Sequence, residues 1–265
     1  MRVGFIGLGR MGQPFATNIM RGGFELVVHD LRPEAADALA KLGARSAASP
    51  REVAQQVDIV AVCVQNDAQV DAVMRRPDGV LAGAHPGLVA VIHTSIHPVE
   101  MQRLAEDAAG QGVDLLDAQM SGGVGGVVDR KMCLMVGGEP GVLERCRPVL
   151  ETTASSIYLL GGVGMGAVTK IAQNTMTATY LMAAVEGFRL AAKAGVDLEV
   201  FQEVVRTSSA QSYVADKYLR EWGSREASWM YHDVLSDALD LAHTYDVPLP
   251  GAAACMQVLA HGLKK

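Results

Sequence analysis

A glycine-rich turn near the start of the chain restricts the fold more than any other feature of the sequence. The apolar run at 2–6 leads into this turn, and a helical pattern follows it to Arg21. In a strand–turn–helix unit, the first glycine allows the tight turn, the second lets a phosphate approach the backbone, and the third lets the helix pack on the strand. The start of the helix also attracts phosphates through its free N–H groups. The turn therefore predicts a dinucleotide site made by Gly7, Leu8, Gly9, Arg10, Met11 and Gly12.

The segments after this turn alternate between strand and helix patterns. Strand patterns lie at 25–29, 58–64, 88–93, 113–117, 132–136 and 156–160, and helical patterns at 33–41, 67–75, 98–109 and 140–150. A capping box from Ser49 to Glu52, with Pro50 at the first helical position, starts one more helix. Such alternation is typical of a doubly wound, mainly parallel sheet. We therefore predict an α/β Rossmann-type domain over residues 1–162.

The second part of the chain shows only helical patterns. One long pattern continues to Gly195, with apolar residues on nearly every face, and further helices are expected after Asp197, over 211–222, over 225–244 and after Pro250. A helix that is apolar all round must be buried in a core or against another chain. We therefore predict an all-helical domain over 163–265, joined by the long helix, that binds substrate and forms a homodimer or homotetramer.

Composition excludes several classes of partner. The chain has 265 residues, of which 49% are hydrophobic and 20% charged, as in globular proteins. The net charge of −6 and the lack of long basic stretches argue against nucleic acid. We expect no membrane segment, no secretory leader and no metal site, because no stretch has the required pattern. The four cysteines form no CxxC pair and lie in apolar stretches, which favours a reduced, cytoplasmic protein.

Two charged residues bear on which dinucleotide is bound. Asp30 ends the second strand pattern. A carboxylate at this position accepts hydrogen bonds from the ribose hydroxyls and repels a 2′-phosphate. Arg32 follows shortly after, and a guanidinium there can hold that phosphate. The pattern therefore favours NAD, with NADP as the alternative.

Two later segments carry candidate residues for substrate binding and catalysis. In the first, Ser121 stands beside Gly122 and Gly123 after a strand pattern. Glycine N–H groups and a hydroxyl form a compact anion-binding site suited to a carboxylate, although glycine runs also form flexible surface loops. In the second, Lys170 and Asn174 share one face of the long apolar helix. A lysine in apolar sequence is commonly a snorkelling side chain, but one beside an asparagine at a domain boundary is a stronger functional candidate.

These segments resemble the β-hydroxyacid dehydrogenase family, typified by 3-hydroxyisobutyrate dehydrogenase and tartronate semialdehyde reductase, over nearly the whole chain. The resemblance is carried by GFIGLGRMGQPFATNI, HTSIHP (93–98), DAQMSGGVGG with CLMVGG, GMGAVTKIAQN, and YHDVLSDALDLA with VPLP. It implies that Lys170 is the catalytic lysine and that Asn174 positions the substrate. It further implies that Ser121, Gly122 and Gly123 bind the substrate carboxylate, and that Val64, Gln65 and Ser95 line the nicotinamide side of the cofactor site.

The chain departs from the family pattern around the expected substrate site. Gln119-Met120 stands in place of Pro-Val, Gln173 in place of an asparagine, and Arg130 in place of a frequent glycine. His232 replaces the lysine of a Lys-Asp motif that normally reaches the cofactor or substrate. An imidazole there is shorter and mostly neutral at pH 7. The chain also ends soon after VPLP, without the last helical stretch of the family.

The residues and the resemblance together predict an oxidoreductase for small β-hydroxy carboxylic acids, with its active site in the cleft between the domains. A lysine whose pKa is lowered by burial can protonate the developing alkoxide and recover the proton in the reverse direction. Two alternatives stay open. An imine or keto-group reductase can share this fold, but it usually has another residue in place of Lys170. A dinucleotide-binding protein without turnover is suggested by His232 and the short C-terminus.

Overall fold

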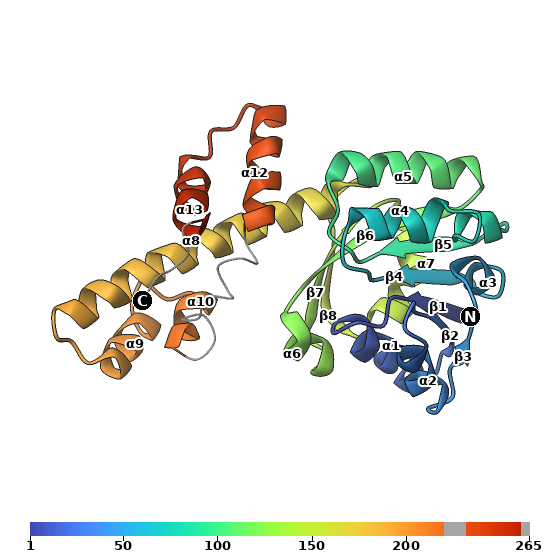
Figure 1. Cartoon of the computed structure of the whole chain (residues 1–265), viewed down its shortest axis with the longest axis horizontal. Helices are drawn as coiled ribbons and strands as arrows, with labels where there is room; N and C mark the ends of the chain where they lie inside the picture. The colour runs from blue at the N-terminus through green and yellow to red at the C-terminus, as the bar shows by residue number, and fades with distance from the viewer. Residues whose placement is uncertain (220–231, 261–265) are drawn as a thin grey trace. The chain divides into compact units, whose positions relative to one another are not determined.

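Residues 1–162 form an eight-stranded sheet with helices on both faces (Figure 1). The computed structural model describes residues 1–219 and 232–260 of the chain. The strands are β1 (Arg2–Ile6), β2 (Glu25–His29), β3 (Arg45–Ser46), β4 (Ile59–Val62), β5 (Val89–Ile92), β6 (Asp114–Ser121), β7 (Met132–Gly137) and β8 (Ala154–Leu159). They lie in the order β3-β2-β1-β4-β5-β6-β7-β8, and every neighbouring pair is parallel except β6 and β7. The predicted mainly parallel, doubly wound sheet is therefore confirmed.

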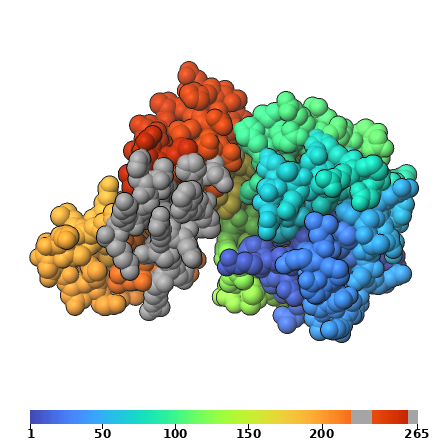
Figure 2. Space-filling model, viewed as in Figure 1, coloured from blue at the N-terminus to red at the C-terminus, as the bar shows by residue number. Residues whose placement is uncertain are grey.

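The helices of this unit cover the two faces of the sheet in separate layers. They are α1 (Gly12–Arg21), α2 (Pro33–Ala40), α3 (Pro50–Ala54), α4 (Asp67–Arg75), α5 (Pro98–Gly110), α6 (Gly123–Val128) and α7 (Pro140–Leu150), with a 3₁₀ turn at Leu81–Gly83. One core cluster joins the sheet to α1, α2, α6 and α7, and a second joins the opposite face to α3, α4 and α5. Figure 2 shows side chains filling the spaces that the ribbons of this unit leave open in Figure 1.

The strand order places a ligand-binding edge at the carboxyl ends of β1 and β4. The chain builds outward from β1 to β2 and β3 on one side, then returns to add β4 on the other. At such a reversal, the loops that leave neighbouring parallel strands diverge to opposite faces and open a crevice. The glycine turn that follows β1 therefore stands where this fold binds dinucleotides.

The structure differs from the sequence analysis in three details of this unit. β6 continues to Ser121 rather than ending at 117, because residues 117–121 pair with the antiparallel strand β7. The glycines after Ser121 do not form a loop but begin the short helix α6. The two-residue strand β3 was not predicted, because it is too short to show a period.

The second part of the chain is helical in all the residues described, as predicted. Its helices are α8 (Met165–Lys193), α9 (Leu198–Arg206), α10 (Tyr213–Asp216), α12 (His232–Tyr245) and α13 (Pro250–Ala260). Side chains of α8, α12 and α13 share one core cluster, and the rings of Phe201 and Tyr218 pack on Phe188. Within the helix predicted over 211–222, α10 starts at Tyr213 and a turn interrupts it at Lys217, and residues 220–222 lie outside the described residues. The predicted helix over 225–244 starts outside the described residues.

Contacts within the chain divide it into two compact units, Met1–Lys170 and Ile171–Lys265. The division lies inside α8, slightly beyond the predicted boundary at 162, because the first turn of α8 packs with the sheet. The ranges 1–162 and 163–265 stay a prediction for the functional domains. None of the helices in the described part of the chain is long and apolar enough to cross a membrane.

Candidate active site

The three glycines of the turn after β1 meet different steric demands. Gly7 has a φ of +92°, and a Cβ there would overlap the carbonyl oxygen of Cys63. A Cβ on Gly12 would overlap the carbonyl oxygen of Gly7, so this glycine lets α1 start close to β1. A Cβ on Gly9 would meet nothing within 4 Å. The fold itself therefore requires Gly7 and Gly12, whereas the open space at Gly9 suits the close approach of a pyrophosphate.

Asp30 is fixed at the end of β2, next to the glycine turn. Its side chain is 9% exposed and accepts hydrogen bonds from the N–H of Leu8 (2.6 Å) and the N–H of Arg32 (2.9 Å). The Arg32 guanidinium adds an ion pair at 3.1 Å and is itself 59% exposed. Burial alone would raise the pKa of Asp30, but the hydrogen bonds from Arg32 and Leu8 outweigh it and lower the pKa. The carboxylate is therefore ionised at neutral pH and held beside the turn.

The segments that follow β4 and β5 are tied together by a threonine. The Thr94 hydroxyl accepts a hydrogen bond from the Val64 N–H (2.9 Å) and donates one to the Val64 carbonyl (3.2 Å). Gln65 and Ser95, the next residues of each segment, are exposed. Because β1, β4 and β5 are parallel neighbours, the segments after them emerge at one edge of the sheet. The structure thus brings the residues predicted for the phosphate and nicotinamide ends of a cofactor to a common edge.

One face of β6 carries a row of polar side chains, Asp117, Gln119 and Ser121. Successive strand residues point to opposite faces, so these alternate positions share one side of the sheet. Gln119 is completely buried, and its Oε1 accepts a hydrogen bond from the Ser95 hydroxyl at 2.8 Å. Ser121, at the end of the row, pairs in register with Cys133 on β7. The row therefore connects the predicted nicotinamide side of the site to the predicted substrate side.

Asp117 attaches the start of α8 to this row. Its completely buried carboxylate accepts hydrogen bonds from the N–H groups of Gly164 (3.0 Å) and Ala167 (2.8 Å). A Cβ on Gly137 or Gly166 would overlap the carboxylate, so both glycines leave room for it. Burial raises the pKa of Asp117, and the backbone hydrogen bonds partly oppose this shift. Asp117 therefore holds the turn of α8 that precedes Lys170.

Lys170 lies on α8 at the end of the first unit and is half-buried. Burial lowers the pKa of Lys170 from 10.5 to about 8, and the Cys133 thiol, which interacts with it electrostatically, opposes this shift. Since Cys133 pairs with Ser121, this interaction relates Lys170 to the end of the polar row where the substrate is predicted to bind. An amine with a pKa near neutrality can both donate and accept a proton under physiological conditions.

The other predicted substrate residues have more varied positions. Gly122 and Gly123 directly follow Ser121, with φ values of +135° and +63°, and both are exposed. Asn174 lies one helical turn after Lys170 on α8, in the second unit. His232 is the first residue of α12, but its side chain lies outside the described residues.

Sequence reasoning missed four residues that complete this arrangement: Thr94, Asp117, Gln119 and Cys133. Thr94 was not singled out, and Gln119 was noted only as a departure from the family pattern. Cys133 was assigned to the core. No local pattern pointed to Cys133, because its position opposite Ser121 follows from the antiparallel register of β6 and β7.

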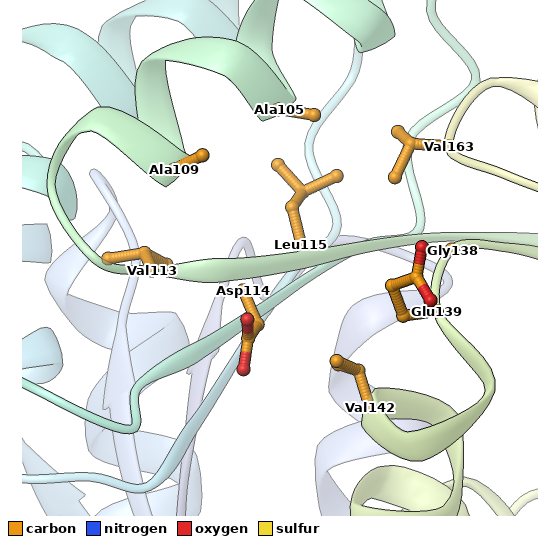
Figure 3. Close-up of a pocket in the computed structure, with 9 residues that line it drawn as sticks. All are labelled: Ala105, Ala109, Val113, Asp114, Leu115, Gly138, Glu139, Val142 and Val163. Atoms are coloured by element: carbon orange, nitrogen blue, oxygen red, sulfur yellow. The ribbon is translucent and has the colours of Figure 1, made fainter.

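A separate cavity lies at the opposite edge of the sheet (Figure 3). It has a volume of about 170 Å³, and its lining includes Asp114, Leu115, Glu139 and Val163. Asp114 is the first residue of β6, so this cavity is at the amino end of the strand, away from the segments that follow β1, β4 and β5. None of the predicted site residues lines it.

The fold and the glycine turn define a dinucleotide-binding protein, and comparisons with known proteins identify its family. A family model described as the NAD binding domain of 6-phosphogluconate dehydrogenase matches residues 2–162. A second, described as NAD-binding of NADP-dependent 3-hydroxyisobutyrate dehydrogenase, matches residues 164–265. The chain belongs to the β-hydroxyacid dehydrogenase family. The predicted family and the predicted nicotinamide dinucleotide cofactor are thereby confirmed.

Individual relatives match nearly the full chain. The 2-(hydroxymethyl)glutarate dehydrogenase of Eubacterium barkeri is 31% identical, over 99% of this chain and 89% of the relative. The 2-hydroxy-3-oxopropionate reductase of Escherichia coli is 33% identical, over 97% of this chain and 90% of the relative. The crystal structure of a 3-hydroxyisobutyrate dehydrogenase from Salmonella typhimurium superposes with a TM-score of 0.87 at 29% identity, covering 98% of this chain and 93% of that one. An imine reductase from Myxococcus stipitatus, at 21% identity and a TM-score of 0.73, shares the fold.

Proposed function

We propose that the protein interconverts a small β-hydroxy carboxylic acid and its oxo or semialdehyde form, as 3-hydroxyisobutyrate dehydrogenase does. The observation that carries this proposal is Lys170, whose pKa is lowered to about 8 and which lies beside the strand pair that bears Ser121. The bound nicotinamide supplies or accepts the hydride. In the reductive direction the Lys170 ammonium gives a proton to the carbonyl oxygen of the substrate as it becomes a hydroxyl. In the oxidative direction the neutral amine removes that proton.

The remaining site residues bind and orient the reactants in this proposal. Ser121 and the N–H groups of Gly122 and Gly123 bind the substrate carboxylate, because a hydroxyl and adjacent glycine N–H groups suit an anion. Asn174 follows Lys170 by one helical turn and orients the substrate through its amide. Residues at the ends of β1, β2, β4 and β5 hold the cofactor: Gly7 to Gly12, Asp30, Arg32, Val64, Gln65 and Ser95, with His232 as a further contact.

Asp30 favours NAD over NADP in this proposal. Its ionised carboxylate beside the glycine turn suits ribose hydroxyls and repels a 2′-phosphate. Arg32 is paired with the same carboxylate, which offsets part of its charge and so weakens its attraction for a phosphate. NADP is therefore expected as the weaker cofactor.

A substrate panel read by the absorbance of reduced nicotinamide tests the proposal. The panel pairs each small β-hydroxy acid with the alcohol that lacks the carboxylate, and each pair is assayed with NAD and NADP. We expect turnover of the acids, at least a tenfold lower kcat/KM for the matched alcohols, corresponding to about 1.4 kcal/mol, and a preference for NAD. Equal turnover of acids and alcohols would contradict the carboxylate site. Turnover of cyclic imines alone would instead favour an imine reductase. Binding of the cofactor without any turnover would favour a non-catalytic dinucleotide-binding protein.

We also infer a homodimer or homotetramer and a cytoplasmic location. Apolar residues of the second unit are exposed in the single chain, among them Leu190, Val200 and Val204. Such a surface suits contact with a second copy. All four cysteines are free thiols, which suits a reducing compartment.

A further inference from the structure

The hydrogen bonds around Gln119 leave its side-chain amide a single orientation. Its Nε2 donates to the carbonyl oxygen of Thr94 at 3.2 Å, and its Oε1 faces the Ser95 hydroxyl at 2.8 Å. A backbone carbonyl only accepts hydrogen bonds. The NH₂ group must therefore face Thr94, because the reversed amide would set two oxygen atoms against each other. The side chain is completely buried, so no solvent is available to satisfy a reversed amide.

This orientation determines the hydrogen-bonding capacity of Ser95. A serine hydroxyl has one proton and two lone pairs. Since the Gln119 Oε1 only accepts, Ser95 gives it the one proton. The exposed side of Ser95 then offers lone pairs alone, and it can bind a ligand only through a donor group on that ligand.

We propose that Gln119 is a positioning residue that fixes Ser95 as an acceptor for the carboxamide N–H of the nicotinamide ring. The inference rests on the proposed function, in which Ser95 lies on the nicotinamide side of the cofactor site. The carboxamide is the part of that ring that carries N–H donors. Gln119 also donates to the carbonyl oxygen of Thr94, whose hydroxyl is bonded to Val64, so Gln119 holds the segment after β5 and Thr94 joins that segment to the one after β4.

Two cofactor analogues separate this role from a structural one. ADP-ribose lacks the nicotinamide, and the 3-acetylpyridine analogue of NAD keeps the ring carbonyl but has a methyl group in place of NH₂. The change Gln119→Met keeps the length of the side chain and removes both hydrogen bonds. We expect it to raise the Kd for NAD about 3- to 10-fold, the factor given by one neutral hydrogen bond. The Kd for ADP-ribose should not change, and the preference for NAD over the acetylpyridine analogue should shrink by the same factor.

A double-mutant cycle with Ser95→Ala tests whether Gln119 acts through Ser95. If it does, the double variant binds NAD about as weakly as Ser95→Ala alone, because the two changes remove one shared interaction. Gln56→Met is the matched control, since the Gln56 amide also donates to a backbone carbonyl, that of Glu52. This control should leave the affinity for every ligand unchanged.

The possible outcomes divide clearly. Additive effects of the two changes, or equal losses of NAD and ADP-ribose binding in Gln119→Met, would overturn the positioning role. If Ser95→Ala, a change at an exposed residue, leaves both NAD binding and the discrimination against the acetylpyridine analogue intact, the placement of the nicotinamide in the proposed function is wrong. Because Ser95→Ala changes an exposed residue and keeps the hydrogen bond from Gln119 to Thr94, this second result does not depend on whether Gln119→Met folds.

Discussion

At the scale of single residues, the proposed chemistry depends on how burial changes the proton affinity of Lys170. Burial disfavours the charged form of a group. It lowers the pKa of this amine from 10.5 to about 8. The folded protein therefore binds fewer protons than the unfolded chain between these two values, so the stability contribution of Lys170 increases as the pH rises from about 8 to 10.5. The burial that prepares the amine for proton transfer thus disfavours the folded state at neutral pH.

The pH dependence of the reaction should report the same pKa. In the oxidative direction kcat should rise as the pH passes through about 8, because the neutral amine is the base, and the reductive rate should fall over the same range. Lys170→Ala should lower kcat at least ~10²-fold and remove this inflection, with little change in the Kd for NAD. The turnover rates of the purified wild type and of Lys170→Ala, measured between about pH 6 and pH 10, test this prediction, because this range spans the pKa of about 8. Near-normal turnover in Lys170→Ala would refute the role.

At the scale of secondary-structure elements, the critical junction is the one between β6 and α8. Its hydrogen bonds run from the N–H groups of Gly164 and Ala167 to the buried carboxylate of Asp117. A helix start has backbone N–H groups without partners inside the helix, and a carboxylate is well suited to bind them. Because Lys170 lies one turn further along α8, this junction also determines where the amine stands.

Removing one acceptor at this junction should affect both stability and catalysis. Asp117→Asn leaves one side-chain oxygen for two N–H donors, and we expect it to lower the free energy of unfolding by about 1–3 kcal/mol and to reduce kcat. Asp114→Asn is the matched control on the same strand, since Asp114 forms an exposed ion pair with Arg145 at 2.6 Å. This control should cost at most about 1 kcal/mol. Urea unfolding and steady-state rates measure the two effects, and equal behaviour of the two variants would contradict the role of Asp117.

At the scale of the whole molecule, the second unit exposes apolar side chains that a single chain does not cover. Val200 and Val204 share one face of α9 and are 61% and 54% exposed. Exposed apolar area of this kind is a common feature of subunit interfaces. The inferred homo-oligomer would bury it.

Charges on this face should weaken assembly. We expect Val200→Glu combined with Val204→Glu to raise the dissociation constant of the oligomer at least tenfold, or about 1.4 kcal/mol, because each carboxylate would have to be desolvated. Leu42→Glu, at a residue 65% exposed in the first unit, is the matched control and should not change assembly. Sedimentation velocity at micromolar concentration measures the difference. A wild-type monomer would contradict the inferred oligomer.

Local patterns were sufficient to predict much of this protein. The glycine turn, the alternation of strands and helices, and the caps at Ser49 and Asp197 all depend on residues a few positions apart. Lys170, Ser121 and Asp30 were predicted as site residues in the same way, from the chemistry of their side chains next to recognisable turns and helices. Such signals can be read in sequence because the backbone geometry that they serve is itself local.

The tertiary structure decided the rest, because the partners involved are far apart in the chain. β6 extends to Ser121 only because β7 pairs with it, and Gln119 accepts a hydrogen bond from Ser95 across a separation of 24 residues. Asp117 reaches Gly164 across 47 residues. No periodic pattern in the local sequence predicts such pairings, since they arise when packing brings distant backbone segments together. By itself, the sequence determined the class of fold and which residues are candidates for the site. Packing decided the hydrogen-bond partners and the pKa values of those residues.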